Sequence, residues 1–599
     1  MSMSDEGLLH AQLLGGEQAA TAWLDSAGKP LTYRDLEERS GRLARRLTDA
    51  GAGPGERVAL FLERGADMAV AMLGVLRAGA AFVPLGLAEP APRLTRILAD
   101  CAPVAVLVHD ATAARFGHDD VRTLSLDEDV DRHGGHEPAT VGDPKDPAYV
   151  IYTSGSSGAP KGVVVEHCNL TPHLDWLAER LPLGTRDRLL QVAPYTFDAS
   201  LTDFFWPLRA GATVVSIAES DHLDPFAIAT ALVEQEITAV RLPPAILPLL
   251  LNEPRLREAT GLRYLISGGD RLPTSTARRI AELLPSVRVF NRYGPTEAAV
   301  AVTYHEFDAD ADTGPDVPIG LGITGAELNV SPDGELLIGG ACVARGYLGD
   351  PALTAQRFVR LPDLGRVFRS GDRVLTTAAG VFEFLGRDDE QVQINGHRVE
   401  IGEVQSALRG HPDVVDCVVL PQDQALAGYA VAAAGRRPSD GIHEYLRDRL
   451  PGHMVPNVIT WVDQLPMTER GKVDIVALRS LLAAPAAEPA PAAEPAPAAE
   501  PALAADPVSA ADPVREAVER VWSQLLGGIE LREDDDFFER GGHSLLAVQA
   551  AGRIRKELGH RIPPRVMFER TTLGEFTKAV REIVSPAGVD SVGTHGGAG

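Results

Sequence analysis

The sequence has 599 residues, 45% of them hydrophobic, and a mean hydropathy close to zero. A chain of this length exceeds one hydrophobic core, so three or four globular domains are expected. Lys and Arg number 57 against 83 Asp and Glu, and the resulting net charge of −26 argues against general affinity for nucleic acid or an anionic membrane.

Cysteine content and the N-terminus indicate the compartment. Four cysteines cannot form a disulfide framework in so long a chain, and none occurs in a paired metal-binding spacing. No apolar run is long enough to cross a membrane, and the first six residues, Met-Ser-Met-Ser-Asp-Glu, lack an export signal. These observations predict a cytoplasmic protein without a membrane partner.

Helical and strand-like segments alternate from Leu31 to about Ile217, as in α/β folds whose parallel sheets are covered by helices. The residue pattern predicts helices over 33–50 and 68–78 and strands over 57–62, 81–85, 213–217, 239–242 and 264–266. We therefore expect residues 1–388 to form a large α/β subdomain with mixed or parallel sheets.

A loop rich in glycine and hydroxyl groups follows one apolar run and precedes another. Its residues 152–162 read Tyr-Thr-Ser-Gly-Ser-Ser-Gly-Ala-Pro-Lys-Gly, between two strand-like stretches. Glycines let a backbone approach an anion closely, while the hydroxyls and Lys161 supply donors and positive charge. The order Gly-Lys-Ser/Thr of the P-loop is missing. The loop alone fits either a phosphate site or a polar surface hairpin.

The pattern changes after residue 388. A strand over 391–394, a helix over about 400–409 and an apolar run over 414–420 predict a small α+β subdomain spanning 389–482. A six-residue repeat over 485–514 then places proline too often for a packed helix. Residues 483–512 are therefore predicted to be an extended linker, which at about 3.1 Å per residue reaches at most roughly 90 Å.

A helical unit follows the linker. Asp512 and Pro513 begin a helix with an apolar face, a second helix begins at Ser544, and a third covers 573–584. We expect residues 513–584 to form an all-α four-helix bundle and the Gly- and Ser-rich residues 585–599 to be disordered.

Several short motifs along the chain fall in a fixed order. They are Leu31-Thr32-Tyr33, the run 76–84, the loop 152–162, Phe197-Asp198-Ala199-Ser200, the run 291–297 (Asn-Arg-Tyr-Gly-Pro-Thr-Glu), Gly334-Glu335-Leu336 with Ala344-Arg345-Gly346-Tyr347, Arg369-Ser370-Gly371-Asp372, the run 386–392 and Gly471-Lys472-Val473-Asp474. This succession resembles the adenylation domains of nonribosomal peptide synthetases, which belong to the adenylate-forming superfamily. The resemblance covers about residues 10 to 480.

The resemblance implies an ATP site with Mg²⁺. The hydroxyl and glycine residues of the loop, with Lys161, are expected to hold the β- and γ-phosphates, and Glu297 is expected to bind Mg²⁺. Tyr293 is expected to stack on adenine, and Asp372 to accept hydrogen bonds from the ribose. The full set of expected nucleotide-binding residues is Thr153, Ser154, Gly155, Ser156, Ser157, Gly158, Lys161, Asn291, Tyr293, Gly294, Thr296, Asp372 and Arg387.

Two residues of the small subdomain carry implied roles. Lys472 matches the catalytic lysine that family members place between the substrate carboxylate, the ribose and the α-phosphate. Asp389 matches the hinge about which the small subdomain rotates between the two half-reactions.

The C-terminal unit resembles a peptidyl carrier domain. In the run 536–545, Asp-Phe-Phe-Glu-Arg-Gly-Gly-His-Ser-Leu, Ser544 matches the serine that carries 4′-phosphopantetheine. A serine exposed at a helix N-terminus suits a phosphodiester anion. A plain helix cap would explain a Gly-His-Ser sequence alone, and the flexible tether and helical unit favour the carrier.

The expected amino-acid pocket contains two arginines. Its positions, carried over by motif register, are Asp198, Ala199, Thr202, Arg241, Ile266, Gly268, Arg292, Val300 and Ala301. Asp198 matches the carboxylate that holds the substrate α-amino group. Because an unpaired buried arginine is costly, the two arginines predict an anionic substrate side chain. In the alternative, one arginine pairs with a protein carboxylate or points outward.

The sequence therefore predicts a free-standing adenylation–carrier didomain of natural-product biosynthesis. L-Aspartate or a close acidic analogue is the expected substrate, with glutamate or a β-modified, phosphono or sulfo acid as rivals. No condensation motif precedes residue 30, so the thioester is expected to be used in trans by a tailoring enzyme or condensation domain. A phosphopantetheinyl transferase is an expected partner and an MbtH-like protein a possible one. The alternatives are an acyl-CoA-type ligase and a carrier or scaffold with a degenerate adenylation domain.

Overall fold

The structure is a computed structural model that describes most of the chain. The described residues are 7–13, 15–118, 120–127, 142–155, 159–387, 391–394, 396–422, 425–433, 441–467, 473–475, 477–478, 512–538, 540–542 and 544–584. The predicted linker, up to residue 511, and the predicted tail lie outside them. Contacts divide the chain into one compact unit of Met1–Val404 with Leu446–Met454 and another of Gln405–Tyr445 with Val455–Gly599.

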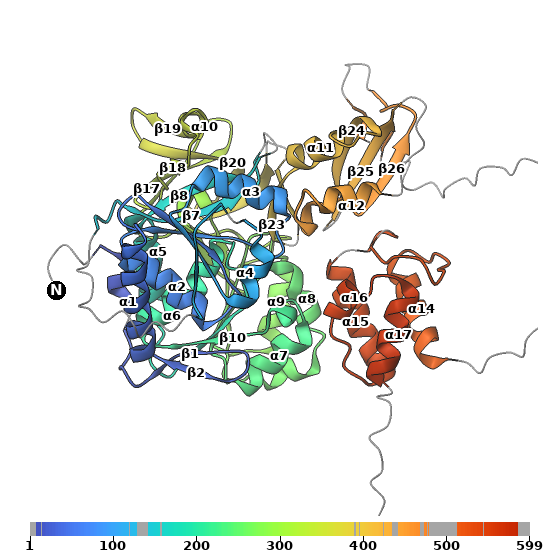
Figure 1. The fold of residues 1–599 in the computed structure, drawn as a ribbon, viewed down its shortest axis with the longest axis horizontal. Helices are drawn as coiled ribbons and strands as arrows, with labels where there is room; N and C mark the ends of the chain where they lie inside the picture. Colours follow the sequence, from blue (N-terminus) through green and yellow to red (C-terminus); the bar gives the residue numbers. More distant parts are fainter. Residues whose placement is uncertain are drawn as a thin grey trace, which may run out of the picture. The chain divides into compact units, whose positions relative to one another are not determined.

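A seven-stranded sheet lies in the N-terminal part of the first unit (Figure 1). Its strands are β3 (Arg57–Phe61), β4 (Ala81–Pro84), β5 (Ala105–Val108), β6 (Thr123–Ser125), β7 (Pro147–Thr153), β8 (Lys161–Glu166) and β18 (Gly346–Tyr347). They follow the order β18-β8-β7-β4-β3-β5-β6. β3 to β7 pair in parallel, whereas β8 and β18 add antiparallel pairs at one edge. The sheet is therefore mixed, as the sequence predicts.

A nine-stranded sheet forms the second half of the same body. Its strands are β1 (Thr21–Leu24), β2 (Pro30–Thr32), β9 (Arg188–Gln191), β10 (Thr213–Ser216), β11 (Ala239–Leu242), β12 (Tyr264–Gly268), β13 (Arg288–Tyr293), β14 (Thr303–Glu306) and β15 (Leu321–Gly322). The order is β15-β14-β13-β12-β11-β9-β10-β1-β2. The six strands from β13 to β1 are parallel, and the edge strands are antiparallel.

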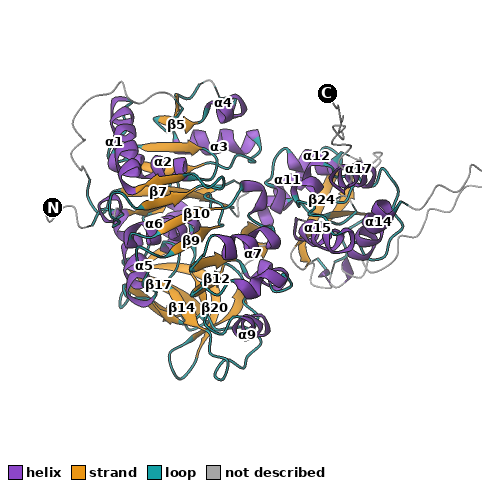
Figure 2. Cartoon of the chain, turned by 90° about the horizontal axis from the view of Figure 1, so that it is seen from below, coloured by secondary structure: helices purple, strands orange, loops and turns teal. Residues whose placement is uncertain are grey.

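Helices separate and cover the two sheets. They are α1 (Tyr33–Asp49), α2 (Ala66–Arg77), α3 (Ala91–Cys101), α4 (Asp110–Phe116), α5 (His167–Arg180), α6 (Ala199–Ala210), α7 (Pro225–Glu234), α8 (Leu247–Leu250) and α9 (Thr274–Leu283). α1, α2, α5 and α6 share one hydrophobic core with a face of each sheet. α3 and α4 cover the other face of the seven-stranded sheet, and α7 to α9 cover the other face of the nine-stranded sheet (Figure 2). The result is a stack of five alternating layers.

An antiparallel five-stranded sheet completes the large body. It contains β16 (Ala326–Val330), β17 (Glu335–Gly340), β19 (Phe358–Leu361), β20 (Gly365–Thr376) and β21 (Phe382–Arg387), with α10 (Pro351–Arg357) before β19. A two-stranded hairpin of β22 (Gln391–Ile394) and β23 (His397–Glu400) follows. The strand predicted over 391–394 is thus confirmed, and it belongs to the first compact unit.

The second unit contains a three-stranded sheet and the C-terminal helices. β24 (Val414–Gln422) pairs antiparallel with β25 (Ala425–Ala432), which pairs in parallel with β26 (Val458–Val462). α11 (Ile401–Arg409) contains the division at Val404, and the end of α12 (Ile442–Arg447) lies in the segment Leu446–Met454 that belongs to the first unit. The domain boundaries predicted from the sequence are not tested by this division and remain predictions.

The C-terminal helices pack around one aromatic core. They are α14 (Pro513–Leu525), α15 (Ser544–Leu558), α16 (Arg565–Glu569) and α17 (Leu573–Val584). Trp522 is fully buried, with its ring 4.8 Å from that of Phe537 and 5.5 Å from that of Phe576. The Asp512 side chain accepts hydrogen bonds from the first backbone N–H groups of α14, as its predicted capping role requires. The expectation of a four-helix carrier fold is confirmed.

Helix length and polarity also bear on the membrane prediction. Among the described residues, no helix combines the length and the apolar character that crossing a bilayer requires.

Candidate active site

The Gly- and Ser-rich loop joins two antiparallel strands. Thr153, the last residue of β7, lies opposite Lys161, the first residue of β8, so the strands predicted on either side of the loop are confirmed. The Ser154 hydroxyl donates a hydrogen bond to the carbonyl of Arg398 (2.9 Å), and the Gly155 N–H donates to Oε2 of Glu403 (3.2 Å). Ser156, Ser157 and Gly158 lie outside the described residues.

A buried charge cluster lies at the base of this hairpin. Oε2 of Glu297 is 2.8 Å from Nη1 of Arg398, and Oε1 is 3.7 Å from Nζ of Lys161. The Tyr347 hydroxyl donates a 2.8 Å hydrogen bond to Oε1, and the ammonium of Lys161 lies over the Tyr347 ring. Nζ of Lys161 is also 3.7 Å from Oε1 of Glu400 on β23. We call Lys161, Glu297, Tyr347, Arg398 and Glu400 the phosphate-side cluster.

The pKa values of this cluster follow from its burial and pairing. Burial lowers the pKa of Lys161 to about 8, and the nearby charge of Arg398 acts in the same direction. Burial alone would raise the pKa of Glu297, but Arg398 and Lys161 hold it well below its usual range. Glu297 is therefore ionised at neutral pH, and Lys161 is a cation close to its titration point.

These residues fit a magnesium nucleotide. The buried Glu297 carboxylate beside Lys161 matches the preference of Mg²⁺ for one or two carboxylates supplemented by phosphate oxygens and water. Glu297, on a short 3₁₀ helix (Thr296–Ala298), would hold the ion, and Lys161 would face phosphate oxygens. In the structure the Arg398 guanidinium contacts Glu297 instead.

The predicted adenine and ribose contacts lie together on β13 and β20. The Asn291 amide donates to the carbonyls of Val317 (2.9 Å) and Pro318 (3.0 Å), while its buried Oδ1 accepts no hydrogen bond from any described residue. That oxygen suits the exocyclic amino group of adenine. An orphaned acceptor at this position fits a purine.

Asp372 is held in a defined orientation. The Tyr293 hydroxyl donates to Oδ2 of Asp372, and Nη1 of Arg387 pairs with Oδ1. Asp372 is almost fully buried, and its backbone N–H donates a hydrogen bond to the Ser370 hydroxyl. The sequence-predicted residues Tyr293, Asp372 and Arg387 are thus in mutual contact.

Asp198 connects the phosphate side to the amino-acid side. It precedes α6 and is half-buried, and its Oδ2 is shielded from solvent with no hydrogen-bond partner among the described residues. Burial raises its pKa, opposed by the charge of Arg292 and a hydrogen bond with the Thr296 side chain. Thr296 precedes Glu297, so the two predicted sites adjoin through adjacent residues.

The two pocket arginines differ in their partners. Nε and Nη2 of Arg241 each lie 3.1 Å from one oxygen of Asp203, which gives a bidentate buried ion pair. Asp203 follows the predicted pocket residue Thr202 on α6, and both are buried. Pairing with a protein carboxylate, the alternative left open by the sequence, therefore applies to Arg241.

Arg292 lacks such a pair. It is buried, and its Nε and Nη1 form no hydrogen bond with any described residue. Burial lowers its pKa, the charge of Arg241 adds to this, and Asp198 opposes it. Gly268, Arg292 and Tyr304 are register neighbours across β12, β13 and β14. A Cβ at Gly268 would lie 2.5 Å from Cγ of Arg292, so the glycine makes room for this side chain.

The remaining predicted pocket residues line the same region. Ile266 lies on β12, Ala199 begins α6, and Val300 and Ala301 are buried before β14. Val300 has φ of 82°, which is rare for a β-branched residue, and Ala299 has φ of 52°. A Cβ at Gly294 would lie 2.5 Å from Cα of Ala301. The loop between Gly294 and Ala301 is therefore held in a strained, closely packed shape.

Three predicted functional residues have no described side chain. Lys472 and Asp389 lie outside the described residues, although Val473 forms an isolated β-bridge with Met467. Ser544 is the first residue of α15, and its side chain also lies outside the described part. A Cβ at Gly542 would lie 2.3 Å from the Phe537 ring, so the turn before Ser544 requires glycine.

Several site residues were not assigned from the sequence. Arg398, Glu400 and Asp203 carried no predicted role, and Tyr347 was noted only within a motif. Asp203 is one residue from a predicted pocket position on a helix that is buried along most of its length. Its sequence signal was an aspartate in an otherwise apolar run.

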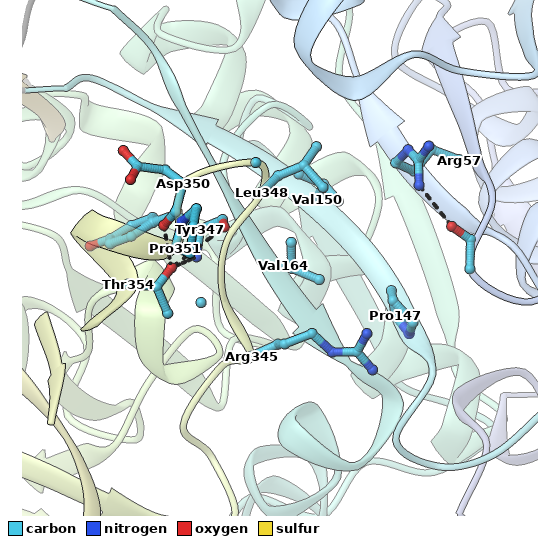
Figure 3. Close-up of a pocket in the computed structure, with 13 residues that line it drawn as sticks. Arg57, Pro147, Val150, Val164, Arg345, Tyr347, Leu348, Asp350, Pro351 and Thr354 are labelled. Carbon is cyan, nitrogen blue, oxygen red and sulfur yellow. Dashed lines mark hydrogen bonds between the residues drawn. The ribbon is translucent and has the colours of Figure 1, made fainter. Parts of the chain in front are cut away.

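A separate cavity lies at the edge of the seven-stranded sheet (Figure 3). It encloses about 430 Å³ between β7, β8 and the turn after β18, with Arg57 and Arg345 at its rim. Both arginines are occupied, since Arg57 donates to the carbonyls of Gly55 and Cys101 and Arg345 pairs with Glu166. Tyr347 lines this cavity and also contacts Glu297.

Comparison with models of known protein families shows to which family the chain belongs. Residues 12–348, more than half of the sequence, match the model described as "AMP-binding enzyme". The chain belongs to this family. Residues 403–472 match the AMP-binding enzyme C-terminal domain, and residues 516–580 match the phosphopantetheine attachment site. An AMP-binding adenylation domain thus precedes a carrier domain, and the cofactors of these domains are ATP, Mg²⁺ and 4′-phosphopantetheine.

Curated relatives of this AMP-binding enzyme are nonribosomal synthetases. Phosphinothricin tripeptide synthetase PhsB of Streptomyces viridochromogenes is 38% identical over 604 residues, covering 96% of the chain and 49% of that protein. Surfactin synthase subunit 3 of Bacillus subtilis is 33% identical, covering 92% of the chain and 43% of that protein. The chain thus spans about half or less of the length of these relatives.

Solved structures support the fold. Holo-PA1221, described as a nonribosomal synthetase protein containing adenylation and carrier domains, has a TM-score of 0.79 at 24% identity, with 94% of each chain covered. At that identity the likeness establishes the fold alone. The four-domain synthetase AB3403 has a TM-score of 0.57 at 28% identity, covering 96% of this chain and 42% of that one.

Proposed function

We propose that this AMP-binding enzyme activates an amino acid with ATP and transfers it to its own carrier domain. A substrate carboxylate oxygen would form a bond to the α-phosphorus while the bond from that phosphorus to the β-phosphate oxygen breaks. Pyrophosphate leaves with the electron pair, and aminoacyl-AMP remains. The chain would supply charge stabilisation and positioning, which are the main requirements of phosphoryl chemistry.

Each group of residues has a part in this half-reaction. The phosphate-side cluster would face the triphosphate, with Lys161 supplying a cation and Glu297 holding Mg²⁺. Asn291 would bind the adenine edge and Asp372 the ribose, oriented by Tyr293 and Arg387. Lys472 would stabilise charge at the reacting carboxylate and α-phosphate, which a compact ammonium can do without a bidentate geometry.

The second half-reaction would occur at the carrier domain. The phosphopantetheine arm on Ser544 supplies a thiol, the group that accepts the aminoacyl moiety as a thioester with release of AMP. Ser544 begins α15, where free N–H groups favour a phosphodiester. Asp389 is the proposed hinge for the movement of the small subdomain between the two reactions.

The observation that carries the proposal is the adjacency of Asp198 to the phosphate-side cluster. Thr296 contacts Asp198, and the next residue is Glu297. A carboxylate whose Oδ2 is shielded from solvent and has no partner among the described residues suits the α-ammonium of an amino acid. A fatty-acid chain would leave the same carboxylate unpaired, at a high desolvation cost.

We further propose an acidic side chain on the substrate, with L-aspartate as the first candidate. Arg292 is buried with two donor nitrogens free of described partners. A substrate anion there and an α-ammonium at Asp198 would satisfy both charges together. Glutamate and β-modified, phosphono or sulfo acids are the other candidates of the same class.

Pyrophosphate exchange over a panel of amino acids tests both proposals. Exchange stimulated by aspartate or glutamate, and weaker by at least tenfold with asparagine or glutamine, is the expected outcome. A preference for a neutral side chain would contradict the acidic substrate. Exchange with free fatty acids and none with amino acids would indicate an acyl-CoA-type ligase, and no exchange at all a degenerate domain.

The two half-reactions can be separated by substitution. Ser544→Ala should abolish thioester loading and leave exchange intact, whereas Lys472→Ala should reduce exchange strongly. Equal loss of exchange in both variants would contradict this division. A phosphopantetheinyl transferase would modify Ser544, and a tailoring enzyme or condensation domain would use the thioester. An MbtH-like protein would be detected as a rise in exchange when it is added.

A further inference from the structure

We propose that Asp203 is a specificity-determining residue. By neutralising Arg241, it leaves Arg292 as the one pocket cation without an ion-pair partner among the described residues. Arg292 then selects a substrate side chain with a single negative charge. This inference rests on the proposed acidic substrate and refines it. It concerns the charge state of the substrate side chain, which separates carboxylates, phosphinates and sulfonates from dianionic phosphonates.

The geometry of the Asp203–Arg241 pair supports the first step. Both carboxylate oxygens of Asp203 are engaged by Arg241 at 3.1 Å, and the aspartate is fully buried. The pair is bidentate and shielded from water, so it persists at physiological ionic strength. Arg241 therefore contributes little net charge to the pocket despite its position.

The charged side chains of the pocket fall into one set that is ion-paired and one set that is not. Arg241 and Asp203 cancel within their pair. Asp198 and Arg292 are not within ion-pair distance of each other in the described structure, yet each charge influences the other. An α-amino acid with one side-chain negative charge would complete this second set, with its ammonium at Asp198 and its anion at Arg292. A second negative charge would have no partner and would be costly to bury.

The surroundings of Arg292 also limit the available cations. His173 lies near Arg292, and burial with the nearby arginine charge lowers the pKa of this histidine to about 3. Its Nε2 is 3.1 Å from the Thr202 hydroxyl. Burial raises the pKa of Tyr304 to about 12, although Arg292 opposes this rise. Both side chains are therefore neutral at pH 7 and supply no further positive charge.

A double-substitution cycle tests the assignment. Asp203→Asn removes one negative charge and leaves the charge of Arg241 unpaired. Arg241→Gln instead leaves Asp203 as a buried unpaired anion. The double variant Asp203→Asn with Arg241→Gln removes a neutral pair. Exchange kinetics are measured for the full chain and the three variants with aspartate, cysteate and 2-amino-3-phosphonopropionate at pH 8. Cysteate and the phosphonate share a tetrahedral side chain and differ in charge, so their kcat/KM ratio isolates charge from shape.

The three variants are expected to affect the phosphonate-to-cysteate kcat/KM ratio and KM in different ways. Asp203→Asn should raise the phosphonate-to-cysteate ratio about tenfold or more, because a new buried cation becomes available to the second charge. Arg241→Gln should weaken all three acidic substrates, mainly through KM. The double variant should return to the wild-type ratio. Asp187→Asn, which removes a carboxylate from the Asp187–Arg263 pair outside the pocket, is the matched control and should not change the ratio.

Other results would overturn the inference. An unchanged ratio in Asp203→Asn, or loss of acidic selectivity in the double variant, would show that Arg241 contacts the substrate itself. If Asp203→Asn fails to fold, the double variant decides the question alone. Absence of wild-type exchange with any acidic amino acid would instead contradict the proposed function. If the wild-type enzyme prefers glutamate, the three substrates are replaced by homologues whose side chains are one methylene longer.

Discussion

Nη1 of Arg398 lies 2.8 Å from Oε2 of Glu297, so the carboxylate expected to bind Mg²⁺ is already neutralised by an arginine of β23. Tyr347 and Lys161 contact its other oxygen. A metal ion at Glu297 would therefore compete with Arg398 for the same negative charge. The hairpin that carries Arg398 follows the predicted hinge at Asp389, and we propose that this competition depends on the position of the hairpin.

Arg398→Gln should tighten binding of magnesium nucleotide. Without the Arg398 guanidinium, Mg²⁺ no longer competes with it for the Glu297 carboxylate. We therefore expect the apparent Kd for Mg²⁺·ATP to fall severalfold. Titration calorimetry with a nonhydrolysable ATP analogue measures this directly. Arg345→Gln, whose partner is Glu166 at the sheet edge, is the control and should leave Kd unchanged. Weaker binding in Arg398→Gln would mean that Arg398 itself contacts phosphate.

Nucleotide affinity should decline as pH rises through about 8. The pKa of Lys161 is lowered to about 8 by burial, so its positive charge is complete below that pH and lost above it. We expect Kd for ATP to rise between pH 7 and 9.5. In Lys161→Arg the guanidinium stays protonated, and this dependence should flatten. An equally steep profile in that variant would assign the titration to another group.

Gly268→Ala should disturb Arg292 rather than the whole fold. The added methyl would lie 2.5 Å from Cγ of Arg292 and equally close to its backbone oxygen, so both the Arg292 side chain and the adjoining strand backbone must move. We expect a loss of about 1–3 kcal/mol in unfolding free energy and a rise of at least tenfold in KM for the acidic substrate.

Gly261→Ala provides the matched comparison for this variant. The nearest atom to a Cβ there is the Ile237 carbonyl oxygen at 3.8 Å, so stability and KM should stay close to wild type. Unchanged substrate kinetics in Gly268→Ala would show that Arg292 does not set selectivity. Thermal unfolding and exchange kinetics together separate the two effects.

Gly542→Ala should impair the carrier domain and spare amino-acid activation. A methyl 2.3 Å from the Phe537 ring cannot be accommodated without moving the turn before Ser544. We expect loss of phosphopantetheine attachment, measured by intact mass, with normal pyrophosphate exchange. Gly552→Ala on α15 meets no atom within 4 Å and should stabilise the helix by up to about 1 kcal/mol. Normal attachment in Gly542→Ala would show that the turn adapts.

Secondary-structure elements and motif residues could be predicted from the sequence more fully than the ion pairs between side chains. The strand over 239–242 and the helix over 573–584 were predicted to the residue, because their apolar periodicity is local. Tyr293, Asp372 and Arg387 were each assigned by motif, and the structure brings them together. The contacts of these motif residues are therefore consistent with a shared site.

Partners distant in sequence could not be predicted in this way. Arg241 pairs with Asp203, 38 residues earlier, and Glu297 with Arg398, 101 residues later. Each pair depends on strand register and on how separate layers stack, which periodicity does not encode. α6 is buried along most of its length, so its pattern gave no sign that Asp203 had a particular partner. The two arginines that the sequence analysis treated alike thus differ in their partners.

The row of Gly268, Arg292 and Tyr304 across three strands limits how this pocket can be redesigned. Space at position 268 is already used by the side chain of residue 292, so bulk at one position excludes bulk at the other. A library that varies residue 292 alone samples only shapes compatible with a bare backbone next to it. On the proposed substrate assignment, reprogramming this enzyme toward larger neutral amino acids would require coordinated exchange at both positions.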